Sequence, residues 1–323
     1  MDARSDTWSP HGFSAYRALY PATPQLEGRV RSDATGEFIV AWDQDDGLCP
    51  PADISCIFVR GLFGEWIPGH FTGPLRALER ASVQAIIARS RASGTIAANA
   101  ALIQRDIEQR IPAANRLAFL CHSKGGLDAL ALLARSAALR ERTAAVVLCQ
   151  TPRGGCAVLE SVLLGRYAES IGGARRRVQE ALARAAIAAC GARPACAELT
   201  SGHIEPTVSR IDAAALPLPV VSVASWSGTP TAWLDSQHGR LQTIRPGCAH
   251  DGLFFVEQLL WPAAEQVLLP QLDHSQPTVG GAGFDHTRFW RALVTLALRR
   301  ARGHIPPGAD RPARGSAPAP RPS

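Results

Sequence analysis

Short, continuously apolar runs alternate with segments of helical periodicity along this chain, and this alternation constrains the fold more than any other feature. Most runs are apolar at every position rather than at every second one, which is typical of strands buried on both faces of a sheet. Seven runs suit strands: 37–42, 54–59, 83–87, 117–121, 144–149, 219–226 and 265–270. Helical patterns lie around 74–81, 95–110, 125–139 and 285–301. A β-α-β-α series of this kind predicts an α/β domain with a mostly parallel sheet and helices on both faces.

Three segments fall outside this series. Residues 1–25 suggest an irregular N-terminal arm, and the Pro-, Arg- and Ala-rich residues 303–323 suggest a disordered tail, so the α/β domain spans 26–302. Residues 153–215 are helical and rich in Ala, Arg and Leu, with no good strand. An insertion between two strands of a parallel sheet predicts a helical cap over the carboxyl edge of the sheet, where ligands bind in open α/β folds.

Composition narrows the class of protein. With 46% hydrophobic and 19% charged residues, the 323-residue chain can bury a substantial core. The net charge of +6 comes from scattered Arg without interleaved aromatics, which indicates solvated helix faces rather than a nucleic-acid surface. The eight cysteines show no zinc-ligand spacing, and only Cys190 and Cys196 are considered as a bridge, in an oxidising compartment. No signal-like or membrane-spanning run is present, so a cytoplasmic location is the default expectation; signal-free secretion and the oligomeric state stay open.

The stretch FLCHSKGGLDAL gives the first indication of chemistry. An apolar strand ends at Cys121, Ser123 occupies the turn, and two glycines open an amphipathic helix. A nucleophile on a sharp strand-to-helix turn needs small neighbours, because the backbone there is strained and closely packed. The helix N-terminus favours negative charge, and the backbone N–H of Lys124 can donate to an oxyanion. Ser123 is therefore the predicted nucleophile, with an ordinary helix cap as the alternative, and His122 beside it is expected to have a structural role.

A serine nucleophile needs a histidine base and an acid that orients the histidine. Where the serine lies on such a turn, the acid and then the histidine follow it along the chain. Asp251 lies in a loop after strand 219–226, and His274 follows strand 265–270. Both would lie at carboxyl ends of strands, as Ser123 does, so we expect these three side chains to meet as a catalytic triad.

Other His and Asp residues compete with this assignment. His250 and Asp273 each adjoin a predicted triad member in sequence, and neighbouring side chains rarely face one another in a triad. His286 lies at the start of the last helical segment and is expected to cap or solvate it. Asp235, in the loop at 227–248, is the stronger rival for the acid.

A second oxyanion donor is expected from the Gly-rich loop after strand 54–59. The backbone N–H of Leu62 or Phe63 is the candidate, and losing one such donor costs about 3 kcal/mol of transition-state stabilisation. The alternative is a strand-to-helix connection without chemistry. Four residues are predicted to line an apolar acyl pocket, or else only to pack between the loop and the cap: Phe63, Trp66, Ile67 and Phe71.

The side chain of Lys124, the only lysine in the chain, has two interpretations. It lies four residues before Asp128 on one helix face, where an ion pair is expected to contribute roughly a few tenths of a kcal/mol. The alternative hypothesis is that the ammonium group reaches the pocket rim and meets a polar part of the substrate.

Taken together, these motifs resemble an α/β-hydrolase of the lipase and esterase type over roughly residues 37–300. FVRGLFG is similar to the family's His-Gly oxyanion loop, CHSKGG to its GHSxGG elbow, CQTPRGG to its Thr-Pro-His/Arg-Gly segment, HDGLFFVEQLLWP to its acid loop and LDHSQ to its histidine loop. Arg60, Cys121 and His250 stand where the family has His, Gly and Asn. The resemblance implies that 153–215 form a lid over the site.

The function expected from these residues and this resemblance is a serine hydrolase that cleaves carboxylic esters through an acyl-enzyme intermediate. Its substrate would be a small ester or lipid, and it needs no metal and no organic cofactor. Two alternatives stay open. An acyltransferase or thioesterase would use the same triad, and a non-catalytic relative would only bind a ligand or partner.

Overall fold

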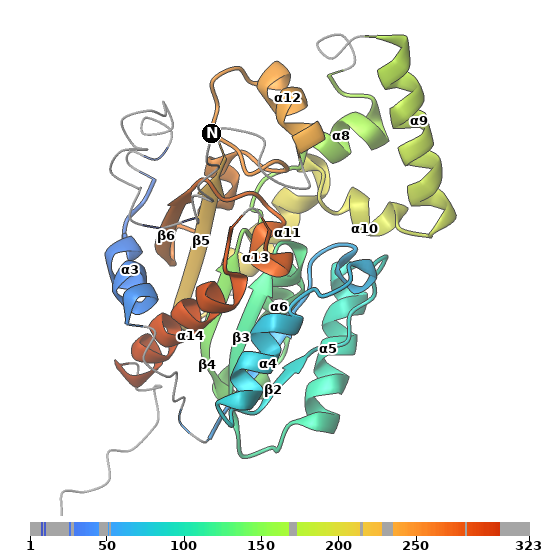
Figure 1. Ribbon diagram of the computed structural model, residues 1–323. Coiled ribbons are helices and arrows are strands. Elements are labelled where there is room, and N and C mark those ends of the chain that lie inside the picture. Colours follow the sequence, from blue (N-terminus) through green and yellow to red (C-terminus); the bar gives the residue numbers. More distant parts are fainter. Residues whose placement is uncertain are drawn as a thin grey trace, which may run out of the picture.

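The computed structural model describes residues 8, 10, 26, 29–44, 51, 53–167, 173–213, 216–227, 235–281 and 283–303. Within this part of the chain, six parallel strands form one sheet in the order β2-β1-β3-β4-β5-β6 (Figure 1). The strands are β1 (Ile54–Val59), β2 (Ala85–Ile87), β3 (Arg116–His122), β4 (Thr143–Cys149), β5 (Val220–Trp226) and β6 (Glu265–Pro270). Nearly every strand residue is buried, as the continuously apolar runs require. The predicted α/β class with a parallel sheet is confirmed.

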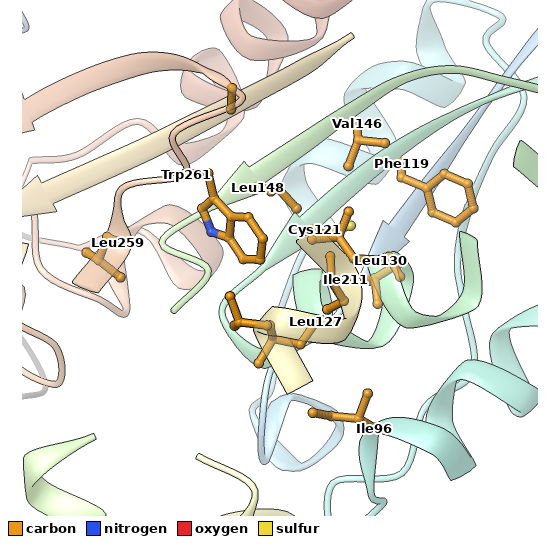
Figure 2. Packing of buried hydrophobic residues seen from close by; sticks show 14 of the residues in the cluster. Ile96, Phe119, Cys121, Leu127, Leu130, Val146, Leu148, Ile211, Leu259 and Trp261 are labelled. Carbon is orange, nitrogen blue, oxygen red and sulfur yellow. The ribbon is translucent and has the colours of Figure 1, made fainter. Parts of the chain in front are cut away.

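Helices cover both faces of the sheet because successive strand side chains point to opposite sides. One face packs against α3 (Thr35–Asp43), α4 (Thr72–Arg80) and α14 (His286–Gly303). The other packs against α5 (Ile96–Arg110), α6 (Lys124–Arg135) and α11 (Ser201–Ala213). Figure 2 shows this second face, where β3 and β4 side chains such as Cys121 and Leu148 share a cluster with Leu127 and Leu130 of α6 and Ile211 of α11.

The prediction of a strand at 37–42 is wrong, because this segment lies in helix α3. Phe38, Ala41 and Trp42 are buried at helical spacing, whereas Val40 between them is 46% exposed. One apolar stripe on a helix is enough to make a six-residue run look continuously apolar.

Two further predictions need correction. The helical pattern at 125–139 is two helices, α6 and α7 (Ala137–Arg142), because Ser136 leaves the helical conformation and its side chain accepts a hydrogen bond from the Leu139 N–H at 3.4 Å. The expected long loop after β5 contains helix α12 (Asp235–Ile244). The other strands and helices lie within a few residues of their predicted ranges.

The inserted segment between β4 and β5 consists of α8 (Ala157–Leu164), α9 (Ala174–Ala189), α10 (Arg193–Ala197) and α11. In Figure 1, α8, α9 and α12 gather beyond one end of the sheet. Helix α11 instead covers the sheet, with Ile204, Val208 and Ile211 in the core cluster that α6 also joins. Helix α8 also contributes Ala157 and Val158 to this cluster, so the part of the insertion without a described side chain in it is α9 and α10.

Helix α9 is held mainly through a carboxylate. Among its described side chains Glu180 alone is buried, and it accepts hydrogen bonds from Ser161 Oγ at 2.6 Å and Arg240 Nη2 at 3.1 Å. The exposed face of α9 carries Val178 and Leu182, which are 58% and 66% exposed. Polar contacts to α8 and α12 thus hold α9 more than apolar burial does.

Within the predicted N-terminal arm, Trp8 is buried and its indole N–H donates to the Pro270 carbonyl at 3.2 Å. Most of the arm and nearly all of the tail lie outside the described residues. Cys190 and Cys196 are both free thiols, so the bridge considered for them is not formed. In the described part of the chain, no helix is both long and apolar enough to cross a bilayer.

Candidate active site

Ser123 lies on a sharp turn between β3 and α6. Its backbone has φ 53° and ψ −132°, a conformation that costs an L-residue of order 1–3 kcal/mol. The Ser123 N–H donates to the Cys149 carbonyl of the neighbouring strand at 2.8 Å and so helps to hold this strain. The loop after β1 packs directly beside it, since a Cβ built on Gly61 would lie 2.9 Å from Ser123 Cβ. The turn presents the hydroxyl group at the carboxyl edge of the sheet.

The glycine that follows Lys124 makes this turn possible. A Cβ built on Gly125 would lie 2.5 Å from the Val59 carbonyl oxygen and 2.6 Å from that of Arg60, and backbone atoms cannot move aside cheaply. We therefore expect Gly125→Ala to lower the free energy of unfolding by about 3 kcal/mol, as measured by chemical denaturation. Gly202→Ala is the matched control, because a Cβ there meets nothing within 4 Å in helix α11. A Gly125→Ala protein as stable as the control would contradict the close packing described.

Three side chains meet at this edge in one hydrogen-bonded chain. His274 Nε2 lies 2.8 Å from Ser123 Oγ, and His274 Nδ1 lies 2.7 Å from Asp251 Oδ2. All three residues are buried, with exposed fractions of 5% for Ser123, 4% for His274 and 0% for Asp251. The second carboxylate oxygen of Asp251 accepts the N–H groups of Leu253 at 3.0 Å and Phe254 at 2.9 Å. Because the carboxylate accepts a hydrogen bond from Nδ1–H, the hydrogen stays on Nδ1 and Nε2 is left as an acceptor for the serine proton.

The rival residues lie elsewhere. Asp273 accepts two backbone N–H groups of the turn after His274, at 2.7 and 3.0 Å. The ring of His250 accepts the Gly252 N–H at 3.2 Å, and burial lowers its pKa to about 4. His286 lies in the first turn of α14 and does not line the cavity at Ser123. The side chain of Asp235 lies outside the described part of the structure.

The three predicted oxyanion donors differ in their hydrogen bonding. The Phe63 N–H donates to the Ala92 carbonyl at 3.4 Å. For Leu62 and Lys124, the described residues offer no hydrogen-bond acceptor to the backbone N–H. The geometry therefore favours Leu62 over Phe63 as the partner of Lys124.

The side chain of Lys124 turns away from the cavity. It is 1% exposed, its Nζ lies 2.7 Å from Asp128 Oδ1, and Asp128 Oδ2 accepts Asn99 Nδ2 at 2.9 Å. Burial raises the pKa of Asp128 to about 6, against the opposing effects of the Lys124 ammonium and the Asn99 amide. The hypothesis of an ammonium at the pocket rim is wrong, because the i, i+4 ion pair takes the group into the protein interior.

A cavity of about 290 Å³ opens at Ser123 and His274. Its apolar wall comes from five separate stretches of the chain: Leu62, Phe63, Ile67, Cys156, Leu159, Leu199, Leu253, Phe254 and Val279. Of the four predicted pocket residues, Phe63 and Ile67 line it, whereas Trp66 and Phe71 do not. Trp66 is 49% exposed and stacks on Phe63, with ring centroids 5.4 Å apart. Phe71 has φ 65° and packs in the core against Phe58 and Trp290.

Two histidines beside the cavity stay neutral. Burial lowers the pKa of His70 to about 3, assisted by Arg60 and His274, and burial holds the pKa of His122 well below its usual range. A second imidazolium so near His274 would oppose the charge that a general base acquires. The two neutral rings therefore place no positive charge beside His274.

Several residues at this site were missed from the sequence. Leu159 and Leu199 belong to the insertion, and no sequence signal says which of its leucines face the cavity. Gln150 had a signal, because it is the polar residue directly after strand 144–149, just as Ser123 closely follows strand 117–121. Its side-chain amide contacts the loop that carries His274.

The parallel sheet, the helices on both faces and the serine on a strand-to-helix turn define the α/β-hydrolase fold, so the fold implied by the resemblance is confirmed. A scan against protein-family models and a search of curated proteins give no match. Among solved structures, the metagenomic carboxyl esterase MGS0156 is similar, with a TM-score of 0.59 and 21% identity over 77% of this chain and 76% of that one. The mature form of the Bacillus licheniformis lipase BlEst2 is also similar, with a TM-score of 0.56 and 17% identity over 76% of this chain and 93% of that one. At these identities the likeness shows a shared fold and nothing more specific.

Proposed function

We propose that this protein is a serine hydrolase that cleaves carboxylic esters. The observation that carries the proposal is the hydrogen-bonded chain from Ser123 through His274 to Asp251 at the mouth of an apolar cavity. The comparisons support the proposal, because two proteins of the same fold are a carboxyl esterase and a lipase.

The reaction follows from the geometry of these groups. Ser123 Oγ attacks the ester carbonyl carbon while His274 Nε2 takes its proton, and Asp251 stabilises the imidazolium that forms. The backbone N–H groups of Leu62 and Lys124 bind the oxyanion. His274 then returns the proton to the leaving alcohol, and water releases the acyl group from Ser123 by the reverse sequence of proton transfers.

The apolar wall of the cavity indicates which part of the substrate binds there. A cavity of about 290 Å³ whose accessible surface is mostly apolar suits the acyl chain of an ester better than a sugar or a peptide. Leu159 and Leu199 bring the insertion onto this wall, and on that basis we assign α8–α10 the role of a lid over the acyl chain.

Two measurements test the proposal on the wild-type protein. Hydrolysis of p-nitrophenyl esters of increasing chain length should release free acid, and a fluorophosphonate should label Ser123. A folded protein that neither hydrolyses any ester of the panel nor reacts with the fluorophosphonate would refute it. Formation of transfer product alone in the presence of an added alcohol would indicate an acyltransferase instead.

The lid residue Leu159 offers a test of the acyl pocket. Leu159→Trp should fill part of the cavity, so kcat/KM for long-chain esters should fall by about tenfold relative to short-chain esters. Leu164→Trp is the control, because Leu164 lies on the same helix but is 55% exposed and away from the cavity. If both variants keep the wild-type chain-length profile, the acyl chain does not bind along α8.

A further inference from the structure

Two side chains from neighbouring strand ends bind successive carbonyl groups of the loop that carries His274. Gln150 Nε2 donates to the Asp273 carbonyl at 2.9 Å, and His122 Nε2 contacts the His274 carbonyl at 2.8 Å. The two side chains also bind each other, with Gln150 Oε1 3.1 Å from His122 Nε2. The backbone on either side of the base is thus tied to β3 and β4, next to the nucleophile.

Burial and hydrogen bonds to every polar atom of its side chain hold Gln150 in this place. It is completely buried and uses every polar atom of its amide, since Nε2 also donates to Ser225 Oγ at 2.6 Å. Its backbone has φ 50°, a strained conformation for a residue other than glycine, and its N–H donates to the Val223 carbonyl at 2.9 Å. Backbone strain that the fold maintains next to a site is a physical reason to look for a role there.

The tautomer of His122 follows from its partners. Both partners of its Nε2, the His274 carbonyl and the Gln150 amide oxygen, are acceptors, so Nε2 carries the hydrogen. Since the buried ring is neutral, Nδ1 carries none. His122 is thus a fixed donor to the loop, and its ring lies 4.8 Å from that of His274 between centroids.

We infer that His122 and Gln150 are positioning residues for the base of the proposed hydrolase, and act as a clamp on the 273–274 backbone. This inference rests on the proposed function. Asp251 controls the rotation of the His274 ring through Nδ1, whereas the clamp places the backbone from which the ring projects. A misplacement of the base by about 1 Å costs about 10²-fold in rate, so the backbone contacts matter even though neither side chain touches the reacting atoms.

A matched pair of substitutions tests the donor at His122. The amide nitrogen of glutamine lies as many bonds from Cα as His Nε2 does, whereas that of asparagine corresponds to Nδ1. We expect His122→Asn to lower kcat by about 10²-fold with little change in KM, and His122→Gln to recover most of the loss. Gln150→Met should behave like His122→Asn. Ser222→Ala is the control for loss of a buried hydrogen bond, here to Leu259 at 3.3 Å, at a sheet position outside the clamp.

Readouts besides turnover separate positioning from general stability. The ring Nδ1 proton of His274 should give a low-field NMR signal in the wild type, broadened or shifted in His122→Asn and restored in His122→Gln. The pH profile of kcat/KM should move together with that signal. Equal loss of kcat in both His122 variants, or an unchanged signal in His122→Asn, would overturn the inference. The NMR comparison requires no esterase activity, so a wild-type protein inert towards esters would refute the proposed function without deciding the clamp.

Discussion

Ser123→Ala is expected to lower kcat/KM for p-nitrophenyl esters by at least about 10⁴-fold. The substitution removes only the hydroxyl group that lies 2.8 Å from His274 Nε2, and without it no acyl-enzyme can form. The residual rate should be that supplied by the oxyanion donors and by binding alone. The variant should also lose fluorophosphonate labelling while its unfolding midpoint stays near that of the wild type.

Ser55→Ala provides the matched control for this result. Ser55 is also fully buried and its hydroxyl bonds Gln84 Oε1 at 2.9 Å, but it lies near the start of β1, at the opposite end of the strand from the site. We expect its turnover to remain close to that of the wild type. Activity that survives in purified Ser123→Ala protein at the control level would show that another group is the nucleophile.

Asp251→Asn should have the second largest effect, a fall in kcat of about 10⁴-fold. An asparagine can keep the contacts of Oδ1 to the Leu253 and Phe254 N–H groups, so the loop should retain its shape. Its NH₂ group, however, would donate to His274 Nδ1 where the carboxylate now accepts. The imidazole would then carry its hydrogen on Nε2, and that nitrogen could not take the proton of Ser123.

Asp273→Asn is the control for the loss of a carboxylate in the same region. Asp273 caps the turn after His274 through one oxygen, and an amide oxygen can accept the same backbone N–H groups. Its kcat should stay within about tenfold of the wild type, because it makes no contact with the ring. Steady-state kinetics and unfolding curves of both variants decide the assignment, which fails if Asp273→Asn is the more damaging substitution.

The local sequence pattern was enough to predict most strands of the sheet. The runs at 54–59 and 265–270 coincide with β1 and β6, because strands buried on both faces need an apolar residue at nearly every position. The same rule misassigned 37–42, since a short helix that presents Phe38 and Trp42 to the core carries an equally dense apolar run. Six residues are too few to distinguish helical from strand periodicity. Only the element that the run packs against shows whether it is a helix or a strand.

Chain order and strand ends were enough to predict that the side chains of Ser123, Asp251 and His274 meet. Parallel strands bring their carboxyl ends to one edge of a sheet, whatever the loop lengths are. The residues that form the cavity wall could not all be predicted in this way. Phe71 lies near the predicted oxyanion loop in sequence, yet its left-handed backbone turns the ring into the core. Leu159 and Leu199 reach the cavity from an insertion whose docking depends on contacts such as those of Glu180.

The sequence by itself thus determined the class of fold and the selection of the three residues, since both depend on local periodicity and on the order of elements along the chain. The tertiary structure alone decided which side chains line the cavity, that Lys124 pairs with Asp128 inside the protein, and that His122 and Gln150 bind the backbone around His274. The physical reason is that the contacts to the His274 loop join residues 123 and 152 positions apart, and that the burial of the Lys124–Asp128 pair depends on how whole elements pack around it.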